Sequence, residues 1–313
     1  MQLGIQIDTG RHIDDVVADV RDARDASFAT VWATQIFAAD TLTVLAVAAR
    51  EVDGIAVGTS VVPVQPRHPE ALALQALTVQ AISRGRLTLG VGLSHQLVVE
   101  QLWGLSYDRP ATYLSEYLDA LIPMLHGEPA AARGELVTAV TMGRVGPEVA
   151  AAPGLIVAAL GPRMLELAGA RTDGTTTWMT GIETLRDYLV PTICAAAADA
   201  GRHAPRVVAK VPFCLTDDVE GAAERIDERL ATYASLPSYE AMLAKQGATK
   251  PSDVSIIGSR ARIEEGIAQL EDAGVTETVL VSMGDAAERT ATTELFAELA
   301  TARHPFTGGS WFA

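Results

Sequence analysis

Short apolar segments alternate with amphipathic segments along almost the whole chain, and this rhythm most constrains the fold. Eight apolar segments have strand length and lack strict alternation, which is typical of parallel strands covered on both sides by helices. They lie at residues 3–7, 30–33, 55–62, 85–93, 155–159, 175–178, 207–215 and 278–281. Helices are expected at residues 12–27, 41–51, 70–82, 98–103, 162–170, 183–200, 219–233, 260–273 and 287–302. The pattern predicts an α/β fold, a (β/α)8 TIM barrel, with an open doubly wound sheet as the alternative.

Two segments interrupt this rhythm. After Gly104 an extra helix is expected at residues 111–125, and residues 127–153 then indicate a short hairpin or an excursion over the surface. A second, polar excursion covers residues 236–255. We therefore expect a single barrel domain over residues 1–313, with insertions at about 104–153 and 236–255.

Composition narrows the classes of partner. With 313 residues and 49% hydrophobic residues, the chain can bury a large core. A formal charge of −15 would repel a nucleic-acid backbone, although a local basic pocket for one anionic ligand stays open. The chain has no 18-residue apolar segment and begins with a strand, so we expect a cytoplasmic protein with no membrane partner. Cys194 and Cys214 lack C-x-x-C spacing and are expected to be buried thiols, with no metal site.

The strand that Gly85 opens carries Gly90 and Gly92 near its end and leads into Ser94 and His95. Glycines there leave no side chains, so some group is expected to approach the backbone closely. The dinucleotide fingerprint G-x-G-x-x-G would need glycine at position 95, which disfavours a Rossmann site. In a barrel the functional groups come from the carboxyl ends of strands, and we expect this rim to hold a flat redox cofactor. The rim residues are Asp8, Thr34, Gln35, Ser60, Val61, Ser94, His95, Gly161, Trp178, Pro212 and Ser282.

A phosphate site is expected where the fifth strand meets its helix. The strand ends in glycine, proline takes the first helical position, and free backbone N–H groups at a helix N-terminus attract anions. Arg163 can add a charge-assisted contact, or it is simply solvated beside a proline-capped helix. The segment is Leu160, Gly161, Pro162, Arg163 and Met164.

Three other features allow two interpretations each. His95 is either a proton donor or cofactor ligand, or a polar cap on the helix that follows. Trp178 either lines the pocket or packs against a neighbouring helix. Arg67 and His68 either bind a charged tail or have no such specific role.

Several motifs together resemble the luciferase-like monooxygenase superfamily, and most closely its branch that uses the deazaflavin coenzyme F420. The resemblance covers almost the whole chain and depends on the order and spacing of the motifs. They are residues 58–62, 66–69, 85–95, 104–110, 116–118, 160–164, 167–169, 173–178, 258–259 and 273–275.

The resemblance implies a (β/α)8 barrel with an insertion near the fifth strand, assembled as a homodimer. It implies a bulge with a non-prolyl cis peptide bond around Ser60–Val61 that backs the deazaflavin ring. The fourth strand would admit the ring, and residues 161–164 would take the phosphate. The implied cofactor-binding residues are Thr34, Thr59, Ser60, Val61, Gly92, Ser94, Leu160, Gly161, Pro162, Arg163, Met164 and Trp178.

The implied chemistry is hydride transfer between F420 and a small-molecule substrate stacked on the ring. His95 resembles the acidic proton donor of sugar-phosphate-oxidising relatives, so the resemblance makes it the general acid. Those relatives carry an Asp-His pair where this chain has Gln35-Ile36. Because Gln35 can hydrogen-bond but cannot move a proton, the catalytic pair His95 and Gln35 favours a reductase. The alternatives are an FMN-dependent monooxygenase and a catalytically silent cofactor-binding protein.

Overall fold

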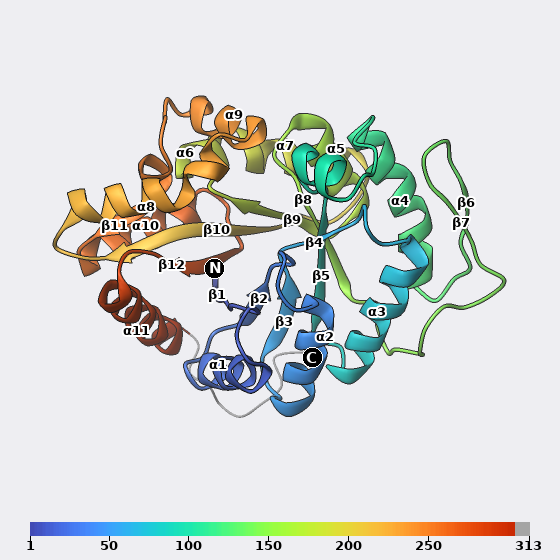
Figure 1. The fold of residues 1–313 in the computed structure, drawn as a ribbon, viewed down its shortest axis with the longest axis horizontal. Helices are drawn as coiled ribbons and strands as arrows, with labels where there is room; N and C mark the ends of the chain where they lie inside the picture. Colours follow the sequence, from blue (N-terminus) through green and yellow to red (C-terminus); the bar gives the residue numbers. More distant parts are fainter. Residues whose placement is uncertain (304–313) are drawn as a thin grey trace. The chain divides into compact units, whose positions relative to one another are not determined.

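Eight strands close into a ring in this protein, whose computed structural model describes residues 1–303 (Figure 1). Their order in the sheet is β10, β12, β1, β2, β3, β5, β8 and β9, and β9 pairs with β10 to complete the ring. The predicted (β/α)8 barrel is therefore confirmed, because an open sheet would end in two unpaired edges. The ring strands are β1 (Gln2–Gln6), β2 (Thr30–Ala33), β3 (Ala56–Thr59), β5 (Leu87–Gly92), β8 (Gly154–Ala158), β9 (Gly174–Trp178), β10 (Arg206–Leu215) and β12 (Glu277–Ser282).

Two further short strands extend this sheet. β4 (Val62–Pro63) continues β3 after a two-residue break and pairs with β5. β11 (Ile256–Gly258) pairs in parallel with the end of β10. The prediction of one continuous strand over residues 55–62 was wrong at residues 60 and 61. Their backbone groups form hydrogen bonds with residues 33–35 instead of with β5.

The helices lie close to their predicted positions. The largest difference is at residues 183–200, where one expected helix is divided by a π-helical turn. Across residues 1–303, every helix is too short or too polar to span a bilayer. The helices are α1 (Ile13–Asp25), α2 (Thr41–Glu51), α3 (Pro69–Ile82), η1 (Val98–Leu102), α4 (Pro110–Leu125), α5 (Pro162–Arg171), α6 (Ile182–Thr184), η2 (Leu185–Leu189), α7 (Val190–Asp199), α8 (Val219–Ala234), α9 (Pro237–Lys245), η3 (Pro251–Val254), α10 (Arg260–Asp272) and α11 (Ala286–Arg303).

The two interruptions have different structures. Residues 127–153 contain the expected hairpin, in which β6 (Ala131–Arg133) and β7 (Thr138–Val140) are antiparallel. The polar excursion at residues 236–255 contains helices α9 and η3, which the sequence analysis missed. Only Met242 and Leu243 of α9 are buried, so the helix shows little apolar periodicity.

The described chain divides into two compact units. We call residues 7–21 and 31–158 the N-terminal unit, and residues 1–6, 22–30 and 159–303 the C-terminal unit. The prediction of one domain over residues 1–313 stays a prediction.

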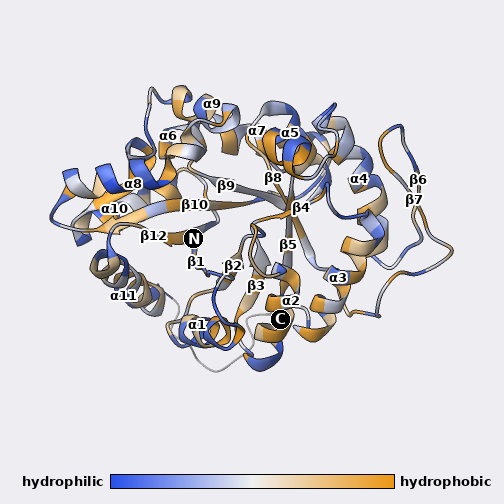
Figure 2. Ribbon diagram, viewed as in Figure 1, coloured by the Kyte–Doolittle hydropathy of each residue, from blue (hydrophilic) through white to orange (hydrophobic). Residues whose placement is uncertain are grey.

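Each unit has its own buried core. In the N-terminal unit Trp32 is fully buried, and a Cβ at Gly58 would lie 2.5 Å from its ring. In the C-terminal unit the rings of Phe213 and Phe296 meet edge to face, with centroids 4.7 Å apart. Cys214 is buried as expected, whereas Cys194 is half-buried. Figure 2 shows hydrophilic and hydrophobic residues along α8, whose buried side chains face this core.

Candidate functional site

The break between β3 and β4 forms a bulge at Ser60 and Val61, and the peptide bond between them is cis, as the resemblance implied. The bulge is hydrogen-bonded to the end of β2. The Ser60 amide donates to the Ala33 carbonyl at 2.8 Å, and the Thr34 hydroxyl donates to the Ser60 carbonyl at 2.8 Å. The Gln35 amide donates to the Val61 carbonyl at 3.1 Å. Backbone groups that leave the β3 ladder are therefore bonded by the neighbouring strand.

Gly90 and Gly92 of β5 leave space for residues 59–61 on the other side of the bulge. The Thr59 hydroxyl donates to the Gly90 carbonyl and accepts from the Gly90 amide, both at 2.8 Å. A Cβ at Gly90 would overlap the Thr59 carbonyl, and one at Gly92 would lie 2.9 Å from the Val61 side chain. The expected close approach to the β5 backbone is confirmed. The approaching groups are the Thr59 carbonyl and the Val61 side chain of the protein itself. The sequence analysis expected room for a cofactor ring there.

Gln35 holds the loop that follows β2. Its side-chain oxygen accepts from the Thr41 amide at 2.9 Å and from Arg67 at 3.4 Å, and its amide nitrogen donates to the Ile36 carbonyl at 3.1 Å. Both polar atoms of Gln35 are thus bonded locally, and its catalytic role stays a prediction.

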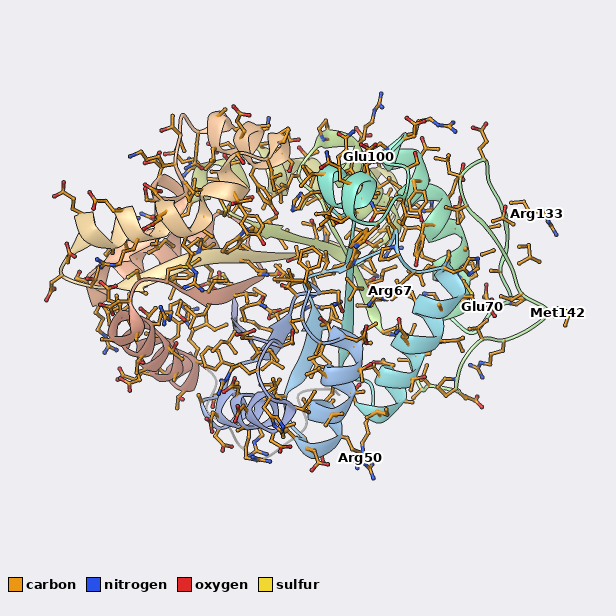
Figure 3. The ribbon with its side chains drawn as sticks, in the orientation of Figure 1. Arg50, Arg67, Glu70, Glu100, Arg133 and Met142 are labelled. Carbon is orange, nitrogen blue, oxygen red and sulfur yellow. The ribbon has the colours of Figure 1, made fainter. Side chains whose placement is uncertain are left out.

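Arg67 also pairs with Asp40 at 2.8 Å, near the start of α2 (Arg67 is labelled in Figure 3). Burial acts to raise the pKa of Asp40, but hydrogen bonds from Thr43 and the Arg67 pair outweigh it and hold the pKa below its usual value. His68 caps α3 by accepting from the Glu70 amide at 3.3 Å. Arg67 and His68 therefore both have structural partners. Their binding of a charged tail stays a prediction.

The end of β5 carries Ser94 and His95, which are both half-buried. The Ser94 amide donates to Gln65 Oε1 at 3.1 Å, a partner that the sequence analysis missed. The His95 carbonyl accepts from the Val99 amide at 3.0 Å, at the start of η1. Burial lowers the pKa of His95 below 6.5, so its imidazole is mainly neutral at pH 7.

These strand ends form one surface, which we call the ring platform: Thr34, Gln35, Ser60, Val61, Ser94 and His95. Strands β2, β3 and β5 are consecutive neighbours in the sheet, so the predicted residues at their ends lie together. All except the buried Ser60 are half-buried. None carries a formal charge at pH 7, so the platform suits a flat, uncharged ring.

The C-terminal unit contains the predicted phosphate segment. Gly161 precedes α5, and no side chain caps this helix end within the described part of the chain. A Cβ at Gly161 would meet open space, and Arg163 is exposed. Tyr188 donates to the Leu160 carbonyl at 3.1 Å, and Lys245 lies 3.7 Å from the centre of the Tyr188 ring. An open helix N-terminus, with an exposed arginine in its first turn, can accept an anion.

Trp178, at the end of β9, packs within the same unit. Its ring meets Tyr233 edge to face at 6.4 Å, and the Lys210 ammonium lies 5.6 Å from its centroid. Packing of Trp178 is therefore confirmed, while its contact with a cofactor stays a prediction. Lys210 lies opposite Trp178 in the β9–β10 pairing and is only 8% exposed. Burial lowers the pKa of Lys210 to about 7. The sequence analysis missed this lysine, whose only signal is one cation inside an apolar strand.

Asp8, another predicted rim residue, forms a hydrogen bond close to it in the sequence. Asp8 accepts from the Gly10 amide at 2.8 Å, within its own turn.

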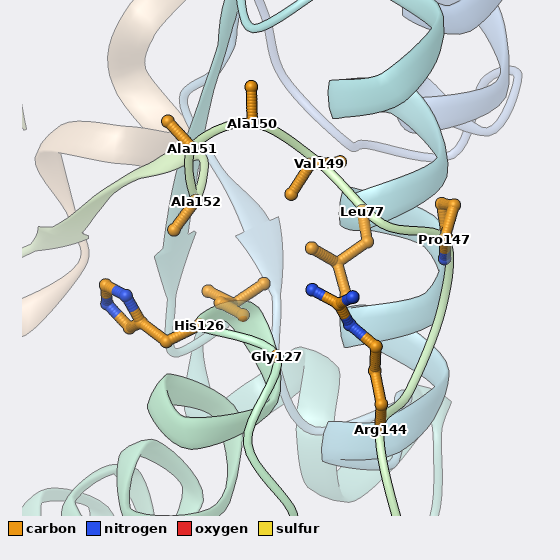
Figure 4. Close-up of a pocket in the computed structure, with 10 residues that line it drawn as sticks. Leu77, His126, Gly127, Arg144, Pro147, Val149, Ala150, Ala151 and Ala152 are labelled. Carbon is orange, nitrogen blue, oxygen red and sulfur yellow. The ribbon is translucent and has the colours of Figure 1, made fainter.

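A cavity of about 280 Å³ lies elsewhere in the N-terminal unit, between Leu77, the end of α4 and residues 144–152 (Figure 4). None of the predicted site residues lines this cavity.

Comparison with known proteins shows which family the chain belongs to. The family described as luciferase-like monooxygenase matches residues 1–301. A 5,10-methylenetetrahydromethanopterin reductase of Methanolobus tindarius is 26% identical over 85% of this chain and 81% of its own length. A Mycobacterium tuberculosis protein provisionally named a coenzyme F420-dependent oxidoreductase is 34% identical over 38% of this chain, and the match spans only 35% of that protein.

Solved structures share the fold. The coenzyme F420-dependent tetrahydromethanopterin reductase from Methanopyrus kandleri has a TM-score of 0.77 and 21% identity, over 95% of this chain and 97% of that one. A type II Baeyer-Villiger monooxygenase component of Pseudomonas putida, in complex with FMN, has a TM-score of 0.75 and 17% identity, over 97% and 98% of the two chains.

Proposed function

Because the chain belongs to the luciferase-like monooxygenase family, we propose that it is an F420-dependent oxidoreductase that reduces a small organic substrate. The main support for the proposal is the uncharged platform around the Ser60–Val61 bulge. The backbone amide of Ser60 and the carbonyls of Ser60 and Val61 are already hydrogen-bonded to residues 33–35. Relatives named for F420 or for methylenetetrahydromethanopterin reduction support F420 over FMN.

The residues present fit such a cofactor in each unit taken separately. The platform in the N-terminal unit offers an uncharged, half-exposed surface for the ring. In the C-terminal unit, the open end of α5 and exposed Arg163 fit a phosphate group. We propose that Leu160, Gly161, Pro162 and Met164 contribute the backbone of that phosphate site.

When bound, F420 supplies the hydride of the reduction. Addition of hydride to a C=C or C=O bond also consumes one proton, which the protein must deliver. Ser60 and Val61 would support the ring, and Thr34 and Gln35 hold their backbone in place. His95 lies at the platform as a mainly neutral imidazole, able to donate one N–H hydrogen bond to the substrate or to accept one from it.

Gln35 supports reduction in preference to sugar-phosphate oxidation. Its amide is occupied by Thr41, Arg67 and Ile36, and an amide does not abstract a proton from a hydroxyl group.

Parallel fluorescence titrations with F420 and FMN test the proposal. We expect saturable F420 binding with little response to FMN, whereas a preference for FMN would favour an oxygen-using monooxygenase. Gly90→Ala should weaken F420 binding at least tenfold, because its Cβ would displace the Thr59 carbonyl and the bulge. Gly143→Ala is the matched control, since its Cβ would meet open space. Failure to bind either cofactor would leave only the fold.

We also propose that the active protein is a homodimer in the cytoplasm. Sedimentation equilibrium of the full chain measures the assembly, and a monomeric mass at micromolar concentration would contradict it.

A further inference from the structure

The cavity beside Leu77 contains the guanidinium group of Arg144 (Figure 4). This group lies against the backbone of Gly127, where α4 has just ended. A Cβ at Gly127 would lie only 2.7 Å from Nη2 of Arg144. Gly127 also has a φ of +78°, a conformation that favours glycine. The missing side chain at Gly127 therefore gives the guanidinium group its place in the cavity.

The hydrogen-bond donors of Arg144 are not used by the protein. Within residues 1–303 the Arg144 side chain forms no hydrogen bond. Its ion pair with Glu148 is 3.6 Å long, and Glu148 is 87% exposed, so this contact is loose and faces solvent. A guanidinium group presents five N–H donors in a fixed fork that matches the oxygens of a carboxylate or phosphate. Arg144 thus offers this fork to a ligand in the cavity.

The wall formed by residues 149–152 adds backbone donors (Figure 4). In the part of the chain that the structure describes, the amides of these four residues donate to no protein acceptor. The loop is nevertheless held in place, because Gln80 of α3 donates to the Ala151 carbonyl at 3.0 Å. Successive free backbone N–H groups are a common part of anion sites. The cavity therefore combines one cationic fork with a wall of amide donors.

This cavity is separate from the ring platform within the same unit. Residues 144–152 lie directly before β8, whereas Ser94 and His95 of the platform follow β5. β5 and β8 pair in parallel, so the cavity and the platform lie at opposite ends of these strands. Strands of this length span about 17–20 Å. A ligand in the cavity would not compete with a ring on the platform.

We propose that the cavity is a second anion site, which binds a phosphate monoester. A carboxylate would use both of its oxygens on the fork of Arg144, whereas a phosphate group has a third terminal oxygen for the amides of residues 149–152. The volume of about 280 Å³ exceeds that of one phosphate ion and leaves room for an organic group beside Leu77 and Leu125. This inference does not rest on the proposed function.

Isothermal titration of the full chain at pH 8 and constant ionic strength tests the proposal. Inorganic phosphate, phenyl phosphate and benzoate are the probes, and both phosphates are dianions at this pH. We expect phenyl phosphate to bind at least threefold more tightly than inorganic phosphate and than benzoate. Equal or tighter binding of benzoate would overturn the assignment to phosphate, and equal binding of the two phosphates would overturn the assignment to a monoester.

Variants locate the binding. Arg144→Gln should raise Kd for phenyl phosphate at least tenfold, and Arg133→Gln, at an exposed arginine of β6 (Figure 3), should change it less than twofold. Glu148→Gln should lower Kd about two- to fivefold, because it removes the carboxylate that competes for Arg144. Arg163→Gln should leave this binding intact, since Arg163 belongs to the phosphate site proposed at α5. A Kd unchanged in Arg144→Gln, or lost in Arg163→Gln, would overturn the inference.

Nuclear magnetic resonance of the amides gives a readout of place. Phenyl phosphate should shift the resonances of residues 149–152 in the wild type and leave those of Ser94 and His95 unchanged. Shifts confined to residues 161–164 would assign the binding to α5 and overturn the second site. Failure of F420 to bind would count against the proposed function and leave this result intact.

Discussion

His95 in the N-terminal unit and Lys210 in the C-terminal unit are both bases whose pKa is lowered by burial. His95 starts from 6.5, so any lowering leaves it mainly neutral at pH 7. Lys210 starts from 10.5 and is lowered to about 7, so close to half of it is protonated at neutral pH. The same physical cause therefore leaves the imidazole mainly unprotonated at pH 7 and the ammonium about half protonated.

The comparison bears on the role expected for His95. The resemblance makes His95 the general acid, whereas a mainly neutral imidazole is suited to orient a carbonyl group by hydrogen bonding. Which of these roles His95 has stays a prediction.

Folding stability measures the lowered pKa of Lys210, and Lys250→Met, at an exposed lysine of the same unit, is the control. Its folded pKa is depressed, so the unfolded chain binds more protons between about pH 7 and 10.5, and stability rises with pH across that window. From pH 6 to 9 the unfolding free energy of the wild type should gain roughly 2–3 kcal/mol relative to Lys210→Met. Urea unfolding at the two pH values measures the difference. Equal slopes in both proteins would mean that Lys210 keeps its proton when folded.

His95→Gln tests the hydrogen bond proposed between His95 and the substrate. Glutamine retains a hydrogen-bond donor and acceptor but cannot titrate, so we expect kcat to fall by less than about tenfold. Steady-state rates from pH 6 to 9 check this expectation, and a hundredfold loss would make His95 the proton donor.

The two bases also show what sequence patterns reveal. The eight strands were predictable because each is an apolar segment with a helical segment beside it. The bulge at Ser60–Val61 was not readable from apolarity, since residues 55–62 form one uniform segment, and it was expected only through the resemblance. Lys210 and Gln65 were missed because one polar residue has no periodicity, and its partners are set by strands far away in sequence. The three-residue β11 is too short to give a pattern.

The smallest effect is expected at the ion pair between Asp40 and Arg67, which also contacts Gln35 of the platform. Asp40→Asn removes the charge paired with Arg67, and we expect a loss of at most about 1 kcal/mol at pH 7, because the carboxylate is partly exposed. Since the folded pKa of Asp40 lies below 3.8, this stabilisation is present above that pH and is lost as pH falls through the folded value. Urea unfolding at pH 7 and pH 3 should therefore show the gap between wild type and variant narrowing. Asp108→Asn, at an exposed carboxylate of the segment after β5, should change stability by less than about 0.5 kcal/mol. A gap that widens in acid would contradict the lowered pKa of Asp40, because protonation of the folded carboxylate must weaken its pair with Arg67.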